Sequence, residues 1–362
     1  MRNVLISGAG VAGSAVAWFL ARDGWTVTVV ERAPGPRTGG QAVDVRGVAL
    51  DVVDRMGLGE RLRAKRTRMR GMSVLDGTGQ ELYRSEEFTH SSGRLDSADF
   101  EILRDDAVAI LHEAADVEYV FGDSVTALAE DAHGVRVEFE HGGFRTFDLV
   151  VGADGLHSAV RRLAFGPEER FSTHLGQYLA IFPAPNFLGL EDWQMWFRHE
   201  ETGGAIYPVR DNTELRVTLG FGSAPLPPMT VPEQKRLIAE RLAGVGWEVP
   251  KLLSAMAEAD VFYFDAMAQI HLDRWSAGRV VLVGDAGYCG SALSGQGTSL
   301  ALAGAYVLAQ ELGRAEHGEA FAAYERRMRP FVALNQALAT ENPTGGPSEE
   351  SLEQAKNALT LG

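Results

Sequence analysis

The sequence is poor in cysteine and in positive charge, and each deficit argues against a class of function. Cys289 is the only cysteine, so no disulfide can form within the chain and a structural zinc site is not expected. Lysine and arginine number 34 against 49 acidic residues, and the formal charge of -15 argues against nucleic acid or an anionic membrane as a partner, because both require a basic surface. The nine histidines show no paired spacing of metal ligands, so the sequence predicts no metal site.

Long apolar runs are absent as well. None approaches the roughly 20 residues needed to cross a bilayer, and the N-terminus shows no basic segment followed by an apolar core and a cleavage site. We therefore expect a cytoplasmic protein without a transmembrane segment, as a monomer or a homodimer. The chain does have 362 residues, 45% of them hydrophobic, which suffices for one large folding unit or two closely joined ones.

A glycine-rich segment near the N-terminus follows a buried strand and opens a helix. The strand is predicted at 3–7, and Gly8, Gly10 and Gly13 follow it with the spacing GxGxxG. The first glycine permits a tight turn, the second lets backbone amides approach a pyrophosphate, and the third lets the helix pack on the strand. Glu31 ends the next predicted strand, where its carboxylate can accept hydrogen bonds from a ribose and would repel the 2′-phosphate of NADP. The predicted nucleotide-binding residues here are Gly8, Gly10, Val11, Ala12, Gly13, Glu31 and Arg32.

A second glycine-rich segment lies near the other end of the chain. Val280–Val283 is a predicted strand that leads into Gly284 and Asp285, and a further helix begins after Gly295–Gly297. Asp285 can bind hydroxyls of a ribityl chain, and the amides at the helix start would stabilise negative charge on a reduced flavin. A helix-capping role for Asp285 is the alternative. Two such segments suit one long ligand held at both ends, which favours FAD over NAD. The predicted FAD-binding residues here are Asp285, Gly295, Gln296 and Gly297.

A third segment, Asp154–Arg161 with the sequence DGLHSAVR, completes a family pattern. With these three motifs the chain resembles the FAD-dependent aromatic hydroxylases of the p-hydroxybenzoate hydroxylase type, the class A flavoprotein monooxygenases. The resemblance extends to about Pro330 and is closest to the compact subgroup that includes tetracycline-inactivating monooxygenases. It implies non-covalent FAD and reduction by NADPH or NADH as a transient co-substrate. O₂ would add at C4a to give a hydroperoxyflavin, which would hydroxylate an aromatic or polycyclic molecule.

The resemblance also assigns individual residues. Asp154 belongs to the segment that serves FAD and the transient nicotinamide, and Arg104 matches the arginine that contacts the phosphate-ribityl region. A guanidinium suits this task because it offers planar, bidentate donors and keeps its charge. Arg46 falls where related enzymes place a residue beside the isoalloxazine, and it is the one candidate for a catalytic side chain. The alternatives are a surface position for Arg104 and a structural salt bridge for Arg46.

Three stretches near the C-terminal motif depart from the family pattern. Gly287-Tyr288 replaces the common Ala-His, Ser291-Ala292 stands where a proline usually shapes the oxygen-reacting side of the flavin, and Ser299 replaces a frequent asparagine. Without that proline φ is not fixed, which makes a flavin-dependent dehydrogenase or reductase the main alternative function and a non-catalytic flavoprotein a third. We expect Cys289, in the same stretch, to be a small buried residue rather than a flavin link.

The pattern of strands and helices predicts an α/β fold, with a Rossmann-like FAD-binding domain and an inserted substrate-binding domain of mixed or antiparallel sheet. Aromatic residues, prolines and alternating strands dominate from Phe171 to Trp275, which marks the insertion. The predicted limits are 1–70, 98–170 and 276–340 for FAD binding, 71–97 and 171–275 for substrate binding, and 341–362 for a C-terminal helix or tail.

The substrate is expected between the flavin and the inserted sheet, and it should be a planar hydrophobic small molecule. Trp196, Tyr207 and Phe221 are candidates for the walls of its site, because aromatic rings pack well on flat apolar molecules. Ordinary core packing is the alternative for each of them.

Overall fold

The computed structural model describes residues 2–36, 38–342 and 346–362. Its first sheet has six strands, of which all but the edge strand β19 run parallel. The central strands are apolar runs such as Val4–Ile6, buried on both faces as a covered parallel sheet requires. In spatial order the strands are β19 (Ser276–Ala277), β20 (Val280–Leu282), β13 (Leu149–Gly152), β1 (Asn3–Ser7), β2 (Thr26–Glu31) and β9 (Glu118–Phe121).

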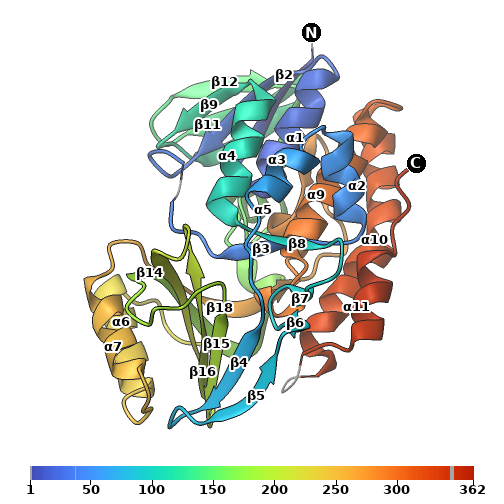
Figure 1. Cartoon of the computed structure of the whole chain (residues 1–362). Coiled ribbons are helices and arrows are strands. Elements are labelled where there is room, and N and C mark those ends of the chain that lie inside the picture. The colour runs from blue at the N-terminus through green and yellow to red at the C-terminus, as the bar shows by residue number, and fades with distance from the viewer. Residues whose placement is uncertain (1, 37, 343–345) are drawn as a thin grey trace.

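Helices and a small sheet cover these strands and close one large hydrophobic core (Figure 1). Helix α1 packs between α4 and α9, and α10 packs on α9 and α11. Helix α5 and the three-stranded antiparallel sheet contact the same strands. The bounds are α1 (Val11–Arg22), α4 (Arg104–Ala115), α5 (Ala159–Phe165), α9 (Gly297–Leu312), α10 (His317–Glu341), α11 (Glu349–Lys356), β10 (Val125–Asp131), β11 (Gly134–Phe139) and β12 (Phe144–Phe147).

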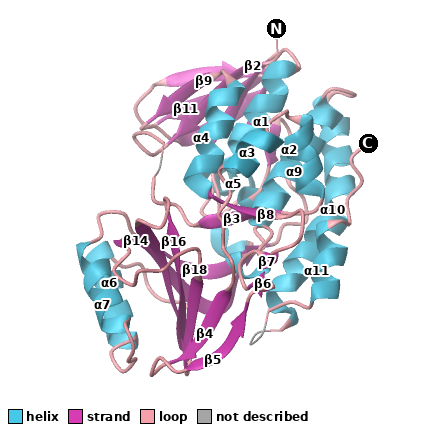
Figure 2. Cartoon of the chain, viewed as in Figure 1, coloured by secondary structure: helices cyan, strands magenta, loops and turns pink. Residues whose placement is uncertain are grey.

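A second large sheet, with seven strands, lies below the first in Figure 2. Its neighbouring strands are antiparallel except β15 and β4, which are parallel. Helices α6 (Val231–Arg241) and α7 (Val249–Glu258) cover one face of it, over a separate hydrophobic core. In spatial order the strands are β18 (Tyr263–Ile270), β14 (Ser172–Pro185), β17 (Glu214–Gly222), β16 (Thr202–Val209), β15 (Gln194–His199), β4 (Met72–Asp76) and β5 (Glu81–Ser85).

The strand register decides which side chains of this second sheet share a face. Phe197, Ile206 and Leu219 belong to the core under α6 and α7. Side chains alternate along a strand, so the neighbouring row, in which Trp196 pairs with Ala205 and Ala205 with Thr218, lies on the opposite face. The second sheet therefore presents two chemically different faces.

Two short antiparallel pairs and several short helices lie around these layers. The pair β3–β8 lies between the two large sheets in Figure 1, and β6 and β7 form a small hairpin that follows β5. The bounds are β3 (Ala42–Val45), β6 (Phe88–Thr89), β7 (Gly93–Arg94), β8 (Phe100–Leu103), α2 (Val48–Arg55), α3 (Gly59–Ala64), α8 (Asp285–Tyr288) and the 3₁₀ turns Glu168–Arg170 and Ala292–Ser294.

The predicted fold class is confirmed, since a parallel sheet flanked by helices is joined to a mixed sheet. The division into two domains with stated limits stays a prediction, and residues 1, 37 and 343–345 of those segments lie outside the described residues. In the described part of the chain, no helix combines the length and the apolar character that crossing a membrane requires.

Candidate functional site

Three segments far apart in the sequence end side by side at one edge of the first sheet. In the register of the parallel strands, Ser7 lies beside Gly152, and Gly152 lies beside Leu282. The amide of Ala153 donates to the carbonyl of Ser7 at 2.8 Å, and the amide of Val283 donates to that of Gly152 at 2.9 Å. The two glycine-rich segments and the Asp154 segment therefore meet at the carboxyl ends of adjacent strands, the usual place for ligands in open α/β sheets.

The three glycines of the first segment are needed for different physical reasons. Gly8 has φ 103°, and a Cβ there would overlap the carbonyl oxygen of Ala153. A Cβ on Gly13 would overlap the carbonyl oxygen of Gly8 itself. Among the described residues, a Cβ on Gly10 would meet no atom within 4 Å, and no side chain caps the start of α1 beside it. Gly8 and Gly13 are thus required by packing, whereas Gly10 leaves the uncapped helix end open to a ligand.

Glu31 lies against this loop, at the end of β2. Its carboxylate accepts hydrogen bonds from the amides of Ala9 and Ala33, each at 3.0 Å. Arg32, the next residue, is exposed. Val11 is half-buried and Ala12 is buried in the first turn of α1.

The second glycine-rich segment touches the first. Gly284 has φ 66°, and a Cβ there would lie 3.0 Å from the Cβ of Ala12 in α1. Asp285 is accessible to solvent, yet the protein atoms crowded around it raise the pKa of its carboxyl, with Arg104 opposing this shift. Gly297 begins α9. In the part of the chain that the structure describes, this helix start has no side-chain cap, and a Cβ on Gly297 would meet nothing within 4 Å.

The Asp154 segment is held by its own hydrogen bonds. Asp154 accepts from the amide of Val160 at 3.1 Å and from the hydroxyl of Ser158, and burial raises the pKa of its carboxyl. Arg161 is fully buried and donates to the carbonyl of Ala286 at 3.0 Å. No role was predicted for Arg161, although it is the last residue of that motif. It ties the Asp154 segment to α8 in the second glycine-rich segment.

Arg46 is buried beside the start of α9. Its guanidinium pairs with Asp44 at 2.9 Å and donates to the carbonyl of Ser91. A Cβ on Gly295 would lie 3.7 Å from a terminal nitrogen of Arg46. Burial raises the pKa of Asp44 to about 7, although Arg46 opposes the shift. Arg46 thus forms the structural salt bridge that was the alternative to a role beside the flavin. This salt bridge lies next to Gly295, one of the predicted cofactor residues.

Several buried polar atoms near α9 have no hydrogen-bond partner among the described residues. They include Nε of Arg46, Oδ1 of Asp44 and both amide atoms of Gln296, whose side chain is 0% exposed. A buried polar group left unpaired costs roughly 1–3 kcal/mol. Such a cluster beside an uncapped helix end indicates a place that a polar ligand completes.

Of the predicted substrate residues, the structure brings two to one face of the second sheet. Trp196 is half-buried on the face opposite the helices, and its indole N–H donates to Gln194 at 3.0 Å. Tyr207 shares that face but is 6% exposed, packs on Leu103, and accepts a hydrogen bond at its hydroxyl from the amide of Ala42 at 2.9 Å. Tyr207 therefore joins the second sheet to β3.

Phe221 is a correction, because the structure does not bring it to that face. It is 3% exposed in the core under α6 and α7, stacked on Tyr178 and Phe264. In β17 it follows Gly220, so the alternation of the strand turns its ring toward the helices. The core-packing alternative holds for Phe221.

Two buried polar residues on the face of Trp196 were missed. Gln194 is 0% exposed, and its amide nitrogen donates to the hydroxyl of Ser91 at 2.7 Å. Arg216 is 1% exposed, donates from Nε to the carbonyl of Gly40 at 2.9 Å and pairs with Glu214. A polar residue in an otherwise apolar strand was the available signal, but the sequence does not show which face it occupies.

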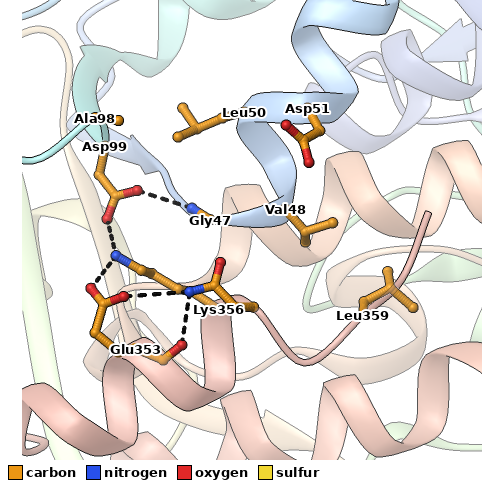
Figure 3. A pocket seen from close by; sticks show the side chains of 10 residues that line it. Gly47, Val48, Leu50, Asp51, Ala98, Asp99, Glu353, Lys356 and Leu359 are labelled. Atoms are coloured by element: carbon orange, nitrogen blue, oxygen red, sulfur yellow. Dashed lines mark hydrogen bonds and ion pairs between the residues drawn. The ribbon is translucent and has the colours of Figure 1, made fainter.

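A cavity of about 390 Å³ beside Gly47 lies outside this group of residues (Figure 3). It is lined by the start of α2, by residues 98–99 and by α11, and it includes no predicted cofactor or substrate residue. Asp99 accepts from the amide of Gly47 at 3.0 Å and from Lys356 at 2.7 Å. The cavity wall thus ties the C-terminal helix to the residue that follows Arg46.

The residues present fit FAD. An uncapped helix end beside Gly10 suits a pyrophosphate, Glu31 lies where a ribose would follow, and the uncapped end of α9 with the unpaired Gln296 amide suits the polar edge of a flavin.

Comparison with known proteins agrees with this reading. A family model described as "FAD binding domain" matches residues 1–336. The chain belongs to this family. It is 37% identical to a flavin-dependent monooxygenase of an unknown prokaryotic organism, over all of this chain and 95% of the relative. It is 49% identical to an uncharacterized protein of Mycobacterium tuberculosis, over all of this chain and 99% of the relative. The crystal structure of tetracycline destructase Tet(51) superposes with a TM-score of 0.89 at 33% identity and covers all of this chain and 99% of that one.

The protein is therefore an FAD-dependent monooxygenase. The structure gives reasons for its departures from the family pattern at Tyr288 and Ser291. A Cβ on Gly304 of α9 would overlap the hydroxyl of Tyr288, so the absence of a side chain there makes room for the larger ring. Cys289 is buried, and burial raises the pKa of its thiol well above the ordinary value, as expected of a small core residue. Ser291 has φ 70°, a left-handed conformation that no proline can adopt.

Proposed function

We propose that this monooxygenase takes electrons from NADPH or NADH and hydroxylates a planar, hydrophobic aromatic or polycyclic molecule. One observation carries the proposal: the face of the second sheet that holds Trp196 is connected through Ser91 to Arg46 and hence to the start of α9. A half-buried aromatic ring is thus linked through Gln194, Ser91 and Arg46 to the place proposed for the flavin. A flat apolar substrate suits such a wall.

The proposed roles of the chain's residues are to bind and orient the cofactor. The open end of α1 at Gly10 would hold the pyrophosphate, and Glu31 the ribose of the adenosine half. Arg104, whose charge acts on Asp285, would contact the phosphate-ribityl region together with that carboxyl. The end of α9, with Gln296, would stabilise negative charge on the flavin. When bound, FAD supplies the redox and oxygen chemistry.

No side-chain nucleophile is required for this reaction, and the protein's part is to exclude water and fix geometry. Trp196 would limit the substrate to a flat shape. Gln194, fully buried on the same face, would hold the Trp196 ring in place by accepting a hydrogen bond from its indole N–H. The tetracycline-inactivating activity named for the structural neighbour makes tetracycline one molecule to test.

The test is turnover of the FAD-loaded protein with NADPH and with NADH under ¹⁸O₂. Candidate substrates are simple phenols, anthraquinones and tetracycline. We expect at least one of them to stimulate nicotinamide oxidation and to gain one ¹⁸O atom, measured by mass spectrometry. Turnover without oxygen incorporation, sustained under anaerobic conditions, would favour the dehydrogenase or reductase alternative. A yellow protein that neither nicotinamide reduces would favour the non-catalytic alternative.

A further inference from the structure

A chain of hydrogen bonds runs from a buried carboxylate to Trp196. The hydroxyl of Ser91 donates to Glu101 at 2.6 Å and accepts from the amide nitrogen of Gln194 at 2.7 Å. The amide oxygen of Gln194 accepts from the indole N–H of Trp196 at 3.0 Å. Ser91 lies in the turn between β6 and β7, whereas Glu101 lies in β8. Three separate elements are therefore linked through one serine.

The polarity of this chain is determined at both ends. A carboxylate only accepts hydrogen bonds and an indole nitrogen only donates, so neither end can be reversed. With its proton given to Glu101, the Ser91 hydroxyl can only accept from Gln194. The Gln194 amide is then fixed with its nitrogen toward Ser91 and its oxygen toward Trp196. An amide that could otherwise flip has one orientation because of Ser91.

Ser91 also makes a contact on the side of the site proposed for the cofactor. The backbone carbonyl of Ser91 accepts from the guanidinium of Arg46, which lies close to Gly295 at the start of α9. Arg46 pairs with Asp44 as well, and both charged groups are largely buried. A shift of the turn at Ser91 would therefore move partners on both sides at once.

We propose that Ser91 is a positioning residue that joins the two sides of the site: its carbonyl holds Arg46, and its hydroxyl sets the orientation of Gln194 and Trp196. The proposal rests on the proposed function only for the ligands that these residues would meet. Its direct consequence is physical, because the Trp196 indole proton is protected only while Ser91 fixes the amide that accepts it.

The test is exchange of indole protons in FAD-loaded protein labelled with ¹⁵N-tryptophan, with the Trp196 signal assigned from a Trp196→Phe variant. Ser91→Ala should speed exchange of the Trp196 indole proton roughly tenfold, the loss of about one net hydrogen bond. Trp193, whose indole N–H donates to Ser73 at 3.1 Å, is the internal reference and should change by no more than about twofold. Ser91→Thr keeps the hydroxyl and should restore slow exchange.

Ser92→Ala is the matched control. Ser92 donates to the same oxygen of Glu101 at 3.0 Å and its hydroxyl lies 3.5 Å from that of Ser91, but no hydrogen bond joins it to Gln194 in the described part of the chain. It should leave the Trp196 proton unchanged. Equal acceleration in the two alanine variants, or none in either, would overturn the proposal. If Ser91→Ala does not fold, Ser91→Cys nearly preserves the volume with a weak acceptor and should still accelerate exchange.

A second readout separates this proposal from the function itself. Because Ser91→Ala keeps the carbonyl that holds Arg46, its FAD dissociation constant should stay within about twofold of the parent value. The exchange experiment needs no turnover, so it can succeed where the hydroxylation test fails. It can likewise fail where the hydroxylation test succeeds. A large loss of FAD affinity with unchanged indole exchange would assign Ser91 to the cofactor side alone and contradict the proposed connection.

Discussion

The two sides of the candidate site, one on the first sheet and one on the second, are shaped by different parts of the chain. On the side of the first sheet, the shape comes from backbone: strand ends, positive-φ glycines and two uncapped helix ends. On the side of the second sheet, it comes from side chains such as Gln194 and Trp196, held by other side chains. In the proposed site the backbone side would bind the dinucleotide, whereas the side-chain side can change from one protein to another without altering the fold.

The largest expected effect tests whether the backbone side depends on the absence of side chains. Gly8→Val should prevent folding, because a β-branched residue would have φ 103° and overlap the carbonyl oxygen of Ala153, at a cost above about 4 kcal/mol. Gly10→Ala should fold, because its Cβ meets no atom within 4 Å, and should lose FAD affinity instead. Soluble yield, circular dichroism and FAD fluorescence separate the two. Equal FAD binding by the Gly10 variant and the parent would contradict the proposed place of the pyrophosphate.

The next effect compares the two faces of the second sheet. Phe221→Ala should destabilise the protein by about 3–5 kcal/mol, since a buried aromatic leaves a cavity in the core under α6 and α7. Trp196→Ala should cost less, because Trp196 is only half-buried. Urea denaturation measures both free energies of unfolding. A larger loss at Trp196 than at Phe221 would mean that the assignment of faces is wrong.

A smaller effect concerns charge on the backbone side. Arg104→Ala should weaken FAD binding roughly tenfold to a hundredfold, since hydrogen bonds to a charged group contribute about 1.5–3 kcal/mol. Arg136→Ala is the control, because Arg136 lies on the small three-stranded sheet over Phe144. Titration of apoprotein with FAD gives both dissociation constants. If both variants bind FAD like the parent, Arg104 has no cofactor role.

The smallest effect concerns an ionic connection between the two sides. His157, in the Asp154 segment, contacts Asp265 of β18 at 2.9 Å and Glu168 at 2.8 Å, and these partners raise its pKa to about 10. A pKa raised above the unfolded value means that the stabilisation is complete below about pH 6.5 and is lost as the pH rises toward 10. The side chain is half-exposed, so we expect about 1 kcal/mol or less.

The measurement for this connection is the difference in melting temperature between the parent and His157→Gln at several pH values. It should be largest near pH 6 and should shrink as the pH approaches 10. A difference that stays constant across this range, or that grows with pH, would show that the charge of His157 does not join the two sides.

The contrast between the sides also explains what the sequence could predict. Gly8, Gly13, Glu31 and the strand ends follow from local spacing, since a turn and the helix after it are made by neighbouring residues. Contacts such as Arg161 to Ala286 or Ser91 to Gln194 join residues about a hundred positions apart, and no local pattern contains them. Phe221 was misplaced for a related reason: a strand's faces depend on its register with neighbours, and a shift of one residue exchanges them.

A crystal structure of the protein with FAD tests the central claim most directly. The account predicts the pyrophosphate at the start of α1 beside Gly10, and the flavin at the start of α9, with the Gln296 amide paired to it and Trp196 on the substrate side. A flavin bound away from α9, with Gln296 still unpaired, would contradict it.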